Sequence, residues 1–305
     1  MEFQTHCLQL PGGRRLAYAT LGPPDGLPLI YLHGGIGTAL TPDPGVVDAV
    51  RAHGVLWVAV SRPGFGGSDL HAGRTLESVA SDVRALAAAH GWREIGVVGV
   101  SSGAPFALAC AAFAPELVRG VALAAPVAGR CAPHAAAGLR RRTRWFLRAV
   151  VDAPEPTIRV LGAAAWLLRR GAPAITRLAD PRRAAAVHAV VAATRAGVRG
   201  PVEDFGVCAG AWPAALTQVS AEVHVWHGLQ DALVPAEHAW ELAGLLPDCR
   251  LRLSHDETHF FFRRRSALIA GELADAVRRH AATARPAGRA RRLAPSRSSG
   301  GTGPW

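Results

Sequence analysis

The sequence of 305 residues contains no lysine, so all 34 of its basic residues are arginines. Heavy use of alanine, glycine and proline accompanies the arginines, which is typical of a biased coding composition. The formal net charge of +11 is therefore poor support for a phosphate-binding face. Five of the arginines also lie in the last part of the chain, after residue 282. We expect no nucleic-acid partner.

Cysteines are few and scattered. There are five, an odd number, and no C-x-x-C pair occurs. This pattern argues against a disulfide framework and against a zinc site, and it favours a reducing compartment such as the cytoplasm. The cysteines are Cys7, Cys110, Cys131, Cys208 and Cys249.

Two kinds of hydrophobic segment are also missing. The first residues contain no basic stretch followed by an apolar run, so we expect no signal peptide. No apolar run reaches about 18 residues, so we expect no membrane partner. Half of the residues are nonetheless apolar, which is enough for one large domain with a sizeable core, or for a domain with an insertion.

One short stretch combines an apolar strand, a tight turn and a helix. Ile95–Val100 is rich in β-branched residues, ends at Ser101, and is followed by a helical apolar pattern to about residue 114. Gly99 and Gly103 flank the serine in the pattern G-x-S-x-G, in which the turn brings the backbone too close for a side chain at either glycine. The serine hydroxyl is then exposed at a helix N-terminus. Alone, the same three residues also suit an ordinary strand-to-helix turn.

A glycine-rich loop follows an earlier strand. The run at 28–32 is apolar without alternation, as in a strand buried on both faces, and it leads into His33, Gly34 and Gly35. Such a loop can present bare backbone N–H groups to an oxyanion, although it also serves as a plain connection. We expect His33 itself to be a structural residue.

Strand-like and helix-like segments alternate along most of the chain, which favours a mostly parallel sheet covered on both faces. The expected strands are 3–10, 14–20, 28–32, 54–60, 95–100, 117–124, 221–226 and 250–253. The expected helices are 46–52, 76–90, 102–114, 236–246 and a last one ending near 280.

The motifs H-G-G-I-G, S-R-P-G-F-G-G-S-D and G-V-S-S-G-A-P-F-A-L-A, in this order, resemble the α/β-hydrolase fold family over roughly residues 3–280. The resemblance implies an eight-stranded, mostly parallel sheet flanked by helices. It departs from the family at Ser61, where the loop commonly opens with aspartate.

Residues 129–200 are rich in alanine and arginine and predict several short helices. The resemblance implies that these helices form a cap over the active site and that residues 1–128 and 201–281 form the core domain. An ordinary helical insertion without contact to the substrate is the alternative. We expect the arginines of the cap to form a solvated face, and Trp145, Phe146 and Trp166 to pack in its interior. Residues 282–305 hold mainly Arg, Pro, Ser and Gly and are expected to be disordered.

A serine nucleophile needs a base and an orienting acid. In H-G-L-Q-D-A-L-V-P, Asp231 follows a strand, and this stretch resembles the family's acid loop. In E-T-H-F, His259 follows the last strand and resembles the catalytic-histidine loop, with Thr258 in place of the usual glycine. His255 is the alternative base, and Asp204 and Asp248 are weaker candidates for the acid.

His255 and His259 stand four residues apart with acids between them. A zincin helix has glutamate directly after its first histidine, whereas here Asp256 follows and the segment comes after a strand. We expect neither a metal nor a cofactor.

The resemblance places the oxyanion hole at the backbone N–H groups of Gly35 and Ser102, with Ile36 as the alternative in the first loop. The expected function is that of a serine hydrolase which cleaves a small carboxylic ester or a related acyl substrate through Ser101, His259 and Asp231. A C–C bond hydrolase, a thioesterase, an aminopeptidase-like enzyme and a cofactor-free perhydrolase would use the same residues. A non-catalytic ligand-binding protein is the alternative outside the enzymes.

Overall fold

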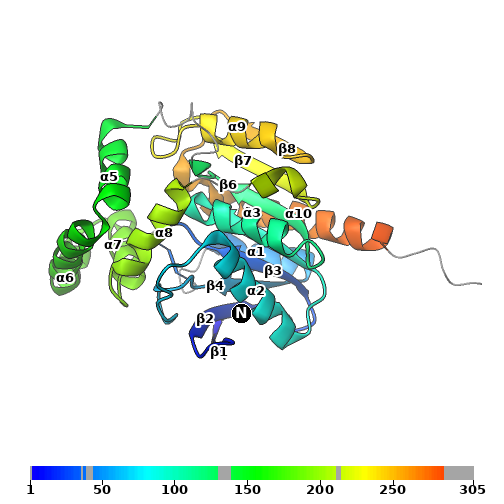
Figure 1. The fold of residues 1–305 in the computed structure, drawn as a ribbon, viewed down its shortest axis with the longest axis horizontal. Coiled ribbons are helices and arrows are strands. Elements are labelled where there is room, and N and C mark those ends of the chain that lie inside the picture. The colour runs from blue at the N-terminus through cyan, green and yellow to red at the C-terminus, as the bar shows by residue number, and fades with distance from the viewer. Residues whose placement is uncertain (1, 36, 39–43, 130–138, 211–213, 285–305) are drawn as a thin grey trace, which may run out of the picture.

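The computed structural model describes residues 2–35, 37–38, 44–129, 139–210 and 214–284. Eight strands form one sheet in the order β1-β2-β4-β3-β5-β6-β7-β8 (Figure 1). β1 and β2 are antiparallel to their neighbours, and the remaining strands are parallel to one another, so the predicted mostly parallel sheet is confirmed. The strands are β1 Gln4–Gln9, β2 Arg15–Leu21, β3 Leu27–Leu32, β4 Val55–Val60, β5 Ile95–Val100, β6 Val118–Ala124, β7 Glu222–Gly228 and β8 Cys249–Ser254.

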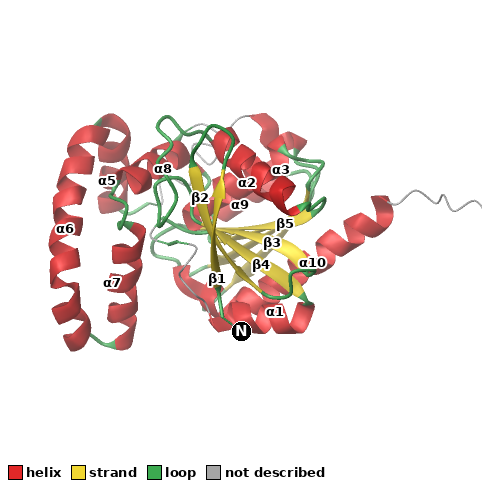
Figure 2. Ribbon diagram, turned by 90° about the horizontal axis from the view of Figure 1, so that it is seen from below, coloured by secondary structure: helices red, strands yellow, loops and turns green. Residues whose placement is uncertain are grey.

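Helices cover both faces of the sheet (Figure 2). α1 (Pro44–His53) and α10 (Phe262–Ala284) pack on one face, and α2 (Leu76–His90), α3 (Ala104–Phe113) and α9 (Glu237–Leu245) pack on the other. The central strands are almost wholly buried, as their unbroken apolar runs predict. The core therefore consists of two apolar layers, one on each face of the sheet.

The helix α2 begins and ends where its sequence predicts. Thr75 and Ser78 form a reciprocal capping box at its start, and Gly91 adopts a left-handed conformation, with φ of 69°, at its end. The predicted apolar stripe is buried against the sheet: Leu76, Val79, Val83 and Leu86.

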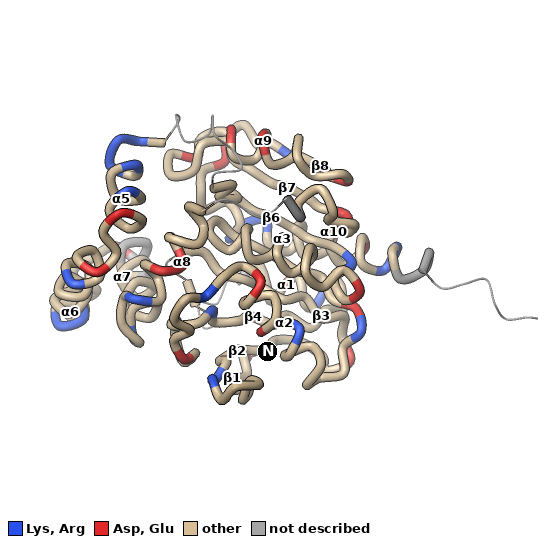
Figure 3. The backbone as a smooth tube through the Cα atoms, viewed as in Figure 1, with Lys and Arg blue, Asp and Glu red and all other residues tan. Residues whose placement is uncertain are grey.

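In the sequence, a group of helices comes between β6 and β7, and this group extends away from the sheet (Figure 1). It comprises α5 (Arg141–Asp152), α6 (Pro154–Leu178), α7 (Pro181–Ala193) and α8 (Arg199–Ala209). The segment 139–200 holds thirteen arginines and three acidic residues, so its formal net charge is +10, against +11 for the whole chain (Figure 3). We call the helices α5–α8 the cap, although α8 runs on to Ala209, past the expected boundary at residue 200.

The expectation about the cap's aromatic residues is wrong for two of them. Trp145 is 74% exposed and Trp166 is 47% exposed, because each lies on the outer side of its helix. The guanidinium of Arg170 lies 3.8 Å from the centre of the Trp166 ring. Phe146 does pack inward, edge-on against Phe205 of α8, with ring centres 5.6 Å apart.

The last helix runs on to Ala284, a few residues beyond the predicted boundary of the tail. The rest of the predicted tail, 285–305, lies outside the described residues. Within the described part of the chain, no helix is both long and apolar enough to cross a bilayer.

Candidate functional site

The candidate residues follow the carboxyl ends of four parallel strands. Gly35 comes after β3, Ser101 after β5, Asp231 after β7 and His259 after β8. Since parallel strands direct their carboxyl ends to one edge of the sheet, the topology brings the four loops to the same edge. Residues far apart in the sequence thus lie at one edge of the sheet.

Ser101 stands at a strained turn between β5 and α3. Its φ is 54°, a left-handed backbone conformation that residues other than glycine rarely adopt. Its carbonyl oxygen accepts a hydrogen bond from Val127 N at 3.2 Å. A Cβ on Gly99 would come within 2.7 Å of Ala107 Cβ, and a Cβ on Gly103 would overlap the backbone oxygen of Leu32. The structure thus confirms that the backbone is too close for a side chain at either glycine.

Asp231 and His259 form a short hydrogen bond. His259 Nδ1 lies 2.6 Å from Asp231 Oδ2, and the other carboxylate oxygen, Oδ1, accepts from the backbone N–H groups of Leu233 and Val234 at 2.8 and 2.9 Å. The carboxylate is fully buried, whereas the histidine side chain is 11% exposed. Among the described residues, the side-chain hydrogen bond of His259 goes to Asp231 and not to Ser101.

The environment of Asp231 keeps it charged. Burial by itself raises the pKa of this carboxyl, but hydrogen bonds from His227 and His259 outweigh burial and hold the pKa well below its ordinary value. The carboxylate is therefore ionised at neutral pH. It can fix the orientation and the tautomer of the imidazole that it contacts.

His227 is a contact of Asp231 that the sequence analysis did not identify. Its Nε2 lies 2.9 Å from the carbonyl oxygen of Val234 and 3.4 Å from Asp231 Oδ2, and the side chain is fully buried. Its position four residues before the aspartate was the only signal of this contact in the sequence.

Backbone contacts hold the loops of Asp231 and His259 against each other. Leu229 N donates to Ser254 O at 2.9 Å, and Gln230 N donates to Glu257 O at 3.0 Å. A Cβ on Gly228 would overlap that same oxygen of Glu257. The relative position of the acid and the histidine is thus set by main-chain hydrogen bonds and by a glycine that permits close approach.

The glycine-rich loop lies beside Ser101. A Cβ on Gly34 would be 3.4 Å from Ser101 Cβ, so the loop passes close to the serine. Ser102 is buried, and its backbone oxygen accepts from Cys208 Sγ at 3.3 Å. The alternative donor Ile36 lies outside the described residues.

His33 is a structural residue, as the sequence predicts. Its Nδ1 donates to Gly34 O at 2.7 Å, and its Nε2 accepts from Arg62 N at 3.3 Å. Burial, and secondly the nearby charge of Arg62, lower the pKa of His33 well below the ordinary value. The ring is therefore neutral, with both nitrogens engaged in holding the loop.

A buried ion pair joins the cap to this loop. Arg62 Nε and Nη2 donate to Asp204 Oδ2 at 2.9 and 2.6 Å, and Arg62 Nη1 donates to His33 O. Both side chains are almost fully buried. Arg74 adds a contact to Asp204 at 3.4 Å and one to Glu203 at 3.0 Å. Asp204 thus fixes α8 to the core rather than serving as the orienting acid.

The other rival residues, His255 and Asp248, are exposed. The His255 side chain is 88% exposed and lies 3.6 Å from the exposed carboxylate of Asp256. Asp248 is exposed at the start of β8, where its backbone oxygen accepts from Val223 N at 2.9 Å. In the described residues, Asp231 contacts His259 and not His255, and the ion pair of His255 is with the exposed Asp256.

Comparisons with known proteins agree with this architecture. A family model described as alpha/beta hydrolase fold matches residues 28–263. A search of curated proteins finds no match.

Many solved structures share the fold at low sequence identity. A hydrolase from Pseudomonas aeruginosa is 22% identical, with 89% of this chain and 97% of that chain covered and a TM-score of 0.66. An esterase from Exiguobacterium antarcticum is 16% identical, with coverages of 90% and 100% and a TM-score of 0.67. The epoxide hydrolase CorEH is 18% identical, with coverages of 90% and 98% and a TM-score of 0.67. Since these neighbours differ in reaction, the fold alone does not assign one.

Proposed function

The chain belongs to the alpha/beta hydrolase fold family, and on that basis we propose that it is a serine hydrolase that cleaves a small carboxylic ester or a related acyl substrate. The observation that carries the proposal is the 2.6 Å hydrogen bond between the buried Asp231 carboxylate and His259 Nδ1. The same edge of the sheet holds Ser101 in a strained turn. This constellation supplies an acid, a base and a nucleophile.

The state of His259 follows from its hydrogen bond. A carboxylate accepts and cannot donate, so Nδ1 carries the proton that lies between His259 and Asp231. In the neutral ring Nε2 then has a free lone pair and acts as the base. As Nε2 takes the Ser101 proton, the adjacent carboxylate stabilises the imidazolium that forms.

The serine oxygen attacks the acyl carbonyl carbon while its proton moves to His259. The carbonyl oxygen becomes an oxyanion that accepts hydrogen bonds from the backbone N–H groups of Gly35 and Ser102. His259 then returns the proton to the leaving group, and an acyl-enzyme remains on Ser101. Water, activated by the same histidine, releases the acid.

The glycine loop is suited to the oxyanion role because hydrogen bonds from His33 and Arg62 hold its backbone in place. The ring of His33 donates to Gly34 O, and Arg62 Nη1 donates to His33 O. A donor group that is already oriented costs no reorganisation as charge develops, and one such donor contributes about 3 kcal/mol to transition-state stabilisation.

Covalent labelling tests the proposal directly. The purified protein is treated with a biotinylated fluorophosphonate probe, and the modified peptide is identified by mass spectrometry. Ser101 attacks phosphorus, fluoride leaves and the serine proton passes to His259, so we expect an adduct on Ser101 in the wild type. Ser101→Ala and His259→Ala should each abolish it while melting near the wild-type temperature.

Ester hydrolysis gives the second readout. We expect kcat for p-nitrophenyl acetate to fall by several powers of ten, on the order of 10⁶, in Ser101→Ala. A Ser101→Ala variant that is folded and retains wild-type turnover would refute the assignment of the nucleophile. Wild-type protein that neither labels nor hydrolyses any ester would refute the proposed function.

A further inference from the structure

The aromatic ring of Phe205 lies directly on the glycine-rich loop. A Cβ on Gly35 would overlap Phe205 Cζ and would lie 3.0 and 3.2 Å from its two Cε atoms. The ring therefore contacts the backbone at the residue that we propose as an oxyanion donor. It reaches this position from α8, so the cap forms one wall of the site.

The order of the strands shows on which side of Ser101 this wall stands. β5 carries the serine, β3 and its glycine loop lie on one side of β5, and β6, β7 and β8 lie on the other. His259 follows β8, so Phe205 and His259 lie on opposite sides of the nucleophile.

This placement distinguishes the two halves of a substrate. The leaving-group oxygen must reach His259 to receive its proton, so the leaving group extends toward β7 and β8. The acyl chain remains attached to the carbonyl carbon on Ser101 and extends away from His259, beside the oxyanion that the glycine loop receives. Phe205 thus stands on the acyl side.

The wall has little freedom to move. The preceding residue, Asp204, is held by the buried Arg62 at 2.6 Å, and about one turn further along α8 Cys208 Sγ contacts Ser102 O at 3.3 Å. On the far side, the ring of Phe146 packs edge-on against Phe205. Moving α8 away from the loop would break a buried ion pair, and turning the ring alone would disturb its contact with Phe146.

We infer that Phe205 is a specificity-determining residue that limits the acyl group of the substrate to a few carbons. The inference rests on the proposed serine hydrolase function. It names the substrate class as esters of short-chain acids, while the leaving group is set by contacts on the other side.

Chain-length dependence tests the inference. We would measure kcat/KM for p-nitrophenyl acetate, butyrate and octanoate with the wild type and with Phe205→Ala and Phe205→Leu. Because a single methylene in an apolar pocket is worth roughly 10- to 200-fold in kcat/KM, we expect the octanoate-to-acetate ratio to rise at least tenfold in Phe205→Ala. Phe205→Leu keeps more of the volume and should give a smaller increase.

Phe3→Ala is the matched control, because Phe3 is a partly buried phenylalanine that packs against the core near the first strand. Its octanoate-to-acetate ratio should equal that of the wild type. Melting temperatures identify any variant that is unfolded, and Phe205→Leu carries the test if Phe205→Ala does not fold.

The outcomes separate the inference from the function on which it rests. Ser101 that labels with the fluorophosphonate probe, together with a ratio unchanged by both Phe205 variants, overturns the inference alone. A wild-type protein that hydrolyses octanoate as readily as acetate also overturns it. Absence of both labelling and hydrolysis in the wild type and in every variant overturns the function and the inference together.

Discussion

Replacing Asp231 with asparagine should invert the tautomer of His259. In the wild type, Oδ1 of Asp231 accepts two backbone N–H groups, and Oδ2 accepts from His259 Nδ1. An amide has only one acceptor atom. If its NH₂ group faced Leu233 and Val234, two backbone hydrogen bonds would be lost, so the amide oxygen should stay there.

The NH₂ group of the introduced amide would then face His259 Nδ1, which must accept rather than donate. The single proton of the neutral ring would move to Nε2, the atom that is needed as the base. The imidazolium formed during the reaction would also lose its carboxylate partner. Loss of the correct tautomer typically costs about 10⁴ in kcat, which corresponds to about 5 kcal/mol of transition-state stabilisation.

The assay is steady-state hydrolysis of p-nitrophenyl acetate by Asp231→Asn, with circular dichroism and melting temperature as checks on the fold. Asp248→Asn is the control, because that residue is exposed at the start of β8, away from His259. It should retain wild-type kcat. A folded Asp231→Asn protein with kcat within tenfold of the wild type would show that Asp231 does not orient the base.

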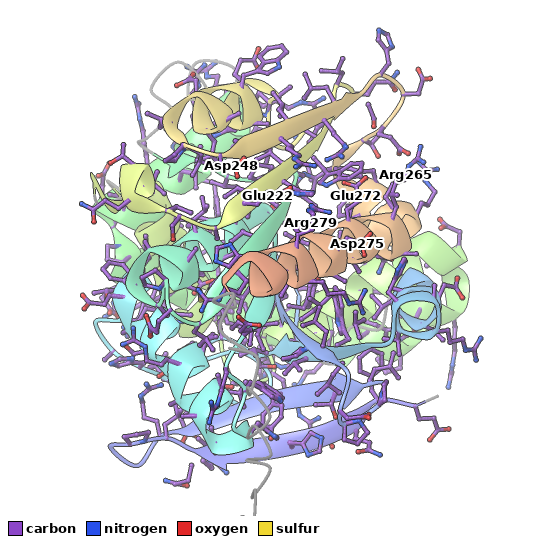
Figure 4. All side chains as sticks on the ribbon, turned by 90° about the vertical axis from the view of Figure 1, so that its right-hand side faces the viewer. Glu222, Asp248, Arg265, Glu272, Asp275 and Arg279 are labelled. Atoms are coloured by element: carbon purple, nitrogen blue, oxygen red, sulfur yellow. The ribbon has the colours of Figure 1, made fainter. Side chains whose placement is uncertain are left out.

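Two predictions concern stability. Burial raises the pKa of Glu222, but hydrogen bonds from His224 and Arg279 outweigh burial and lower it (Figure 4). The ionised carboxylate therefore stabilises the fold fully above its pKa in the unfolded chain, about 4.3. This stabilisation is lost as the pH falls through the pKa of Glu222 in the folded protein. Glu222→Gln should therefore melt below the wild type at neutral pH, and the gap should narrow below about pH 4; a gap that is constant with pH would contradict the assignment. In urea titrations, Gly103→Ala should lower the free energy of unfolding by about 3 kcal/mol, because the added Cβ would overlap a backbone oxygen. Gly244→Ala is the control: Gly244 lies in open space on α9, and alanine there should raise the free energy of unfolding by up to about 1 kcal/mol.

Features of the fold that depend only on residues close together in the sequence were predictable. The burial of β5 follows from its unbroken apolar run, and the glycines around Ser101 follow from the tight turn. The stripe of α2 follows from its helical spacing. Each of these features requires only that a short segment satisfy its own backbone and bury its own apolar side.

Contacts between distant segments were not predictable in this way. Arg62 and Asp204 are 142 positions apart, and nothing in either local pattern indicates that they form a buried pair. Phe205 lies on Gly35 from α8, a helix that this pair and the contacts of Arg74 and Cys208 hold on the core. The exposed position of Trp145 likewise depends on how α5 packs. An aromatic residue of an amphipathic helix can lie on the buried or on the exposed side, and the segments that pack against the helix decide which.

The conformation of Ser101 depends both on its local turn and on contacts with distant segments of the chain. A serine with φ of 54° costs energy that glycine would avoid, so the strain persists only where the surroundings enforce it. Here Val127 N holds the serine carbonyl from one side, and the close approach of Gly103 to Leu32 fixes the chain on the other. A turn built only to connect a strand to a helix would gain stability from glycine at position 101. The proposed role of Ser101 as the nucleophile accounts for a serine on this strained turn, at the edge that also holds Asp231 and His259.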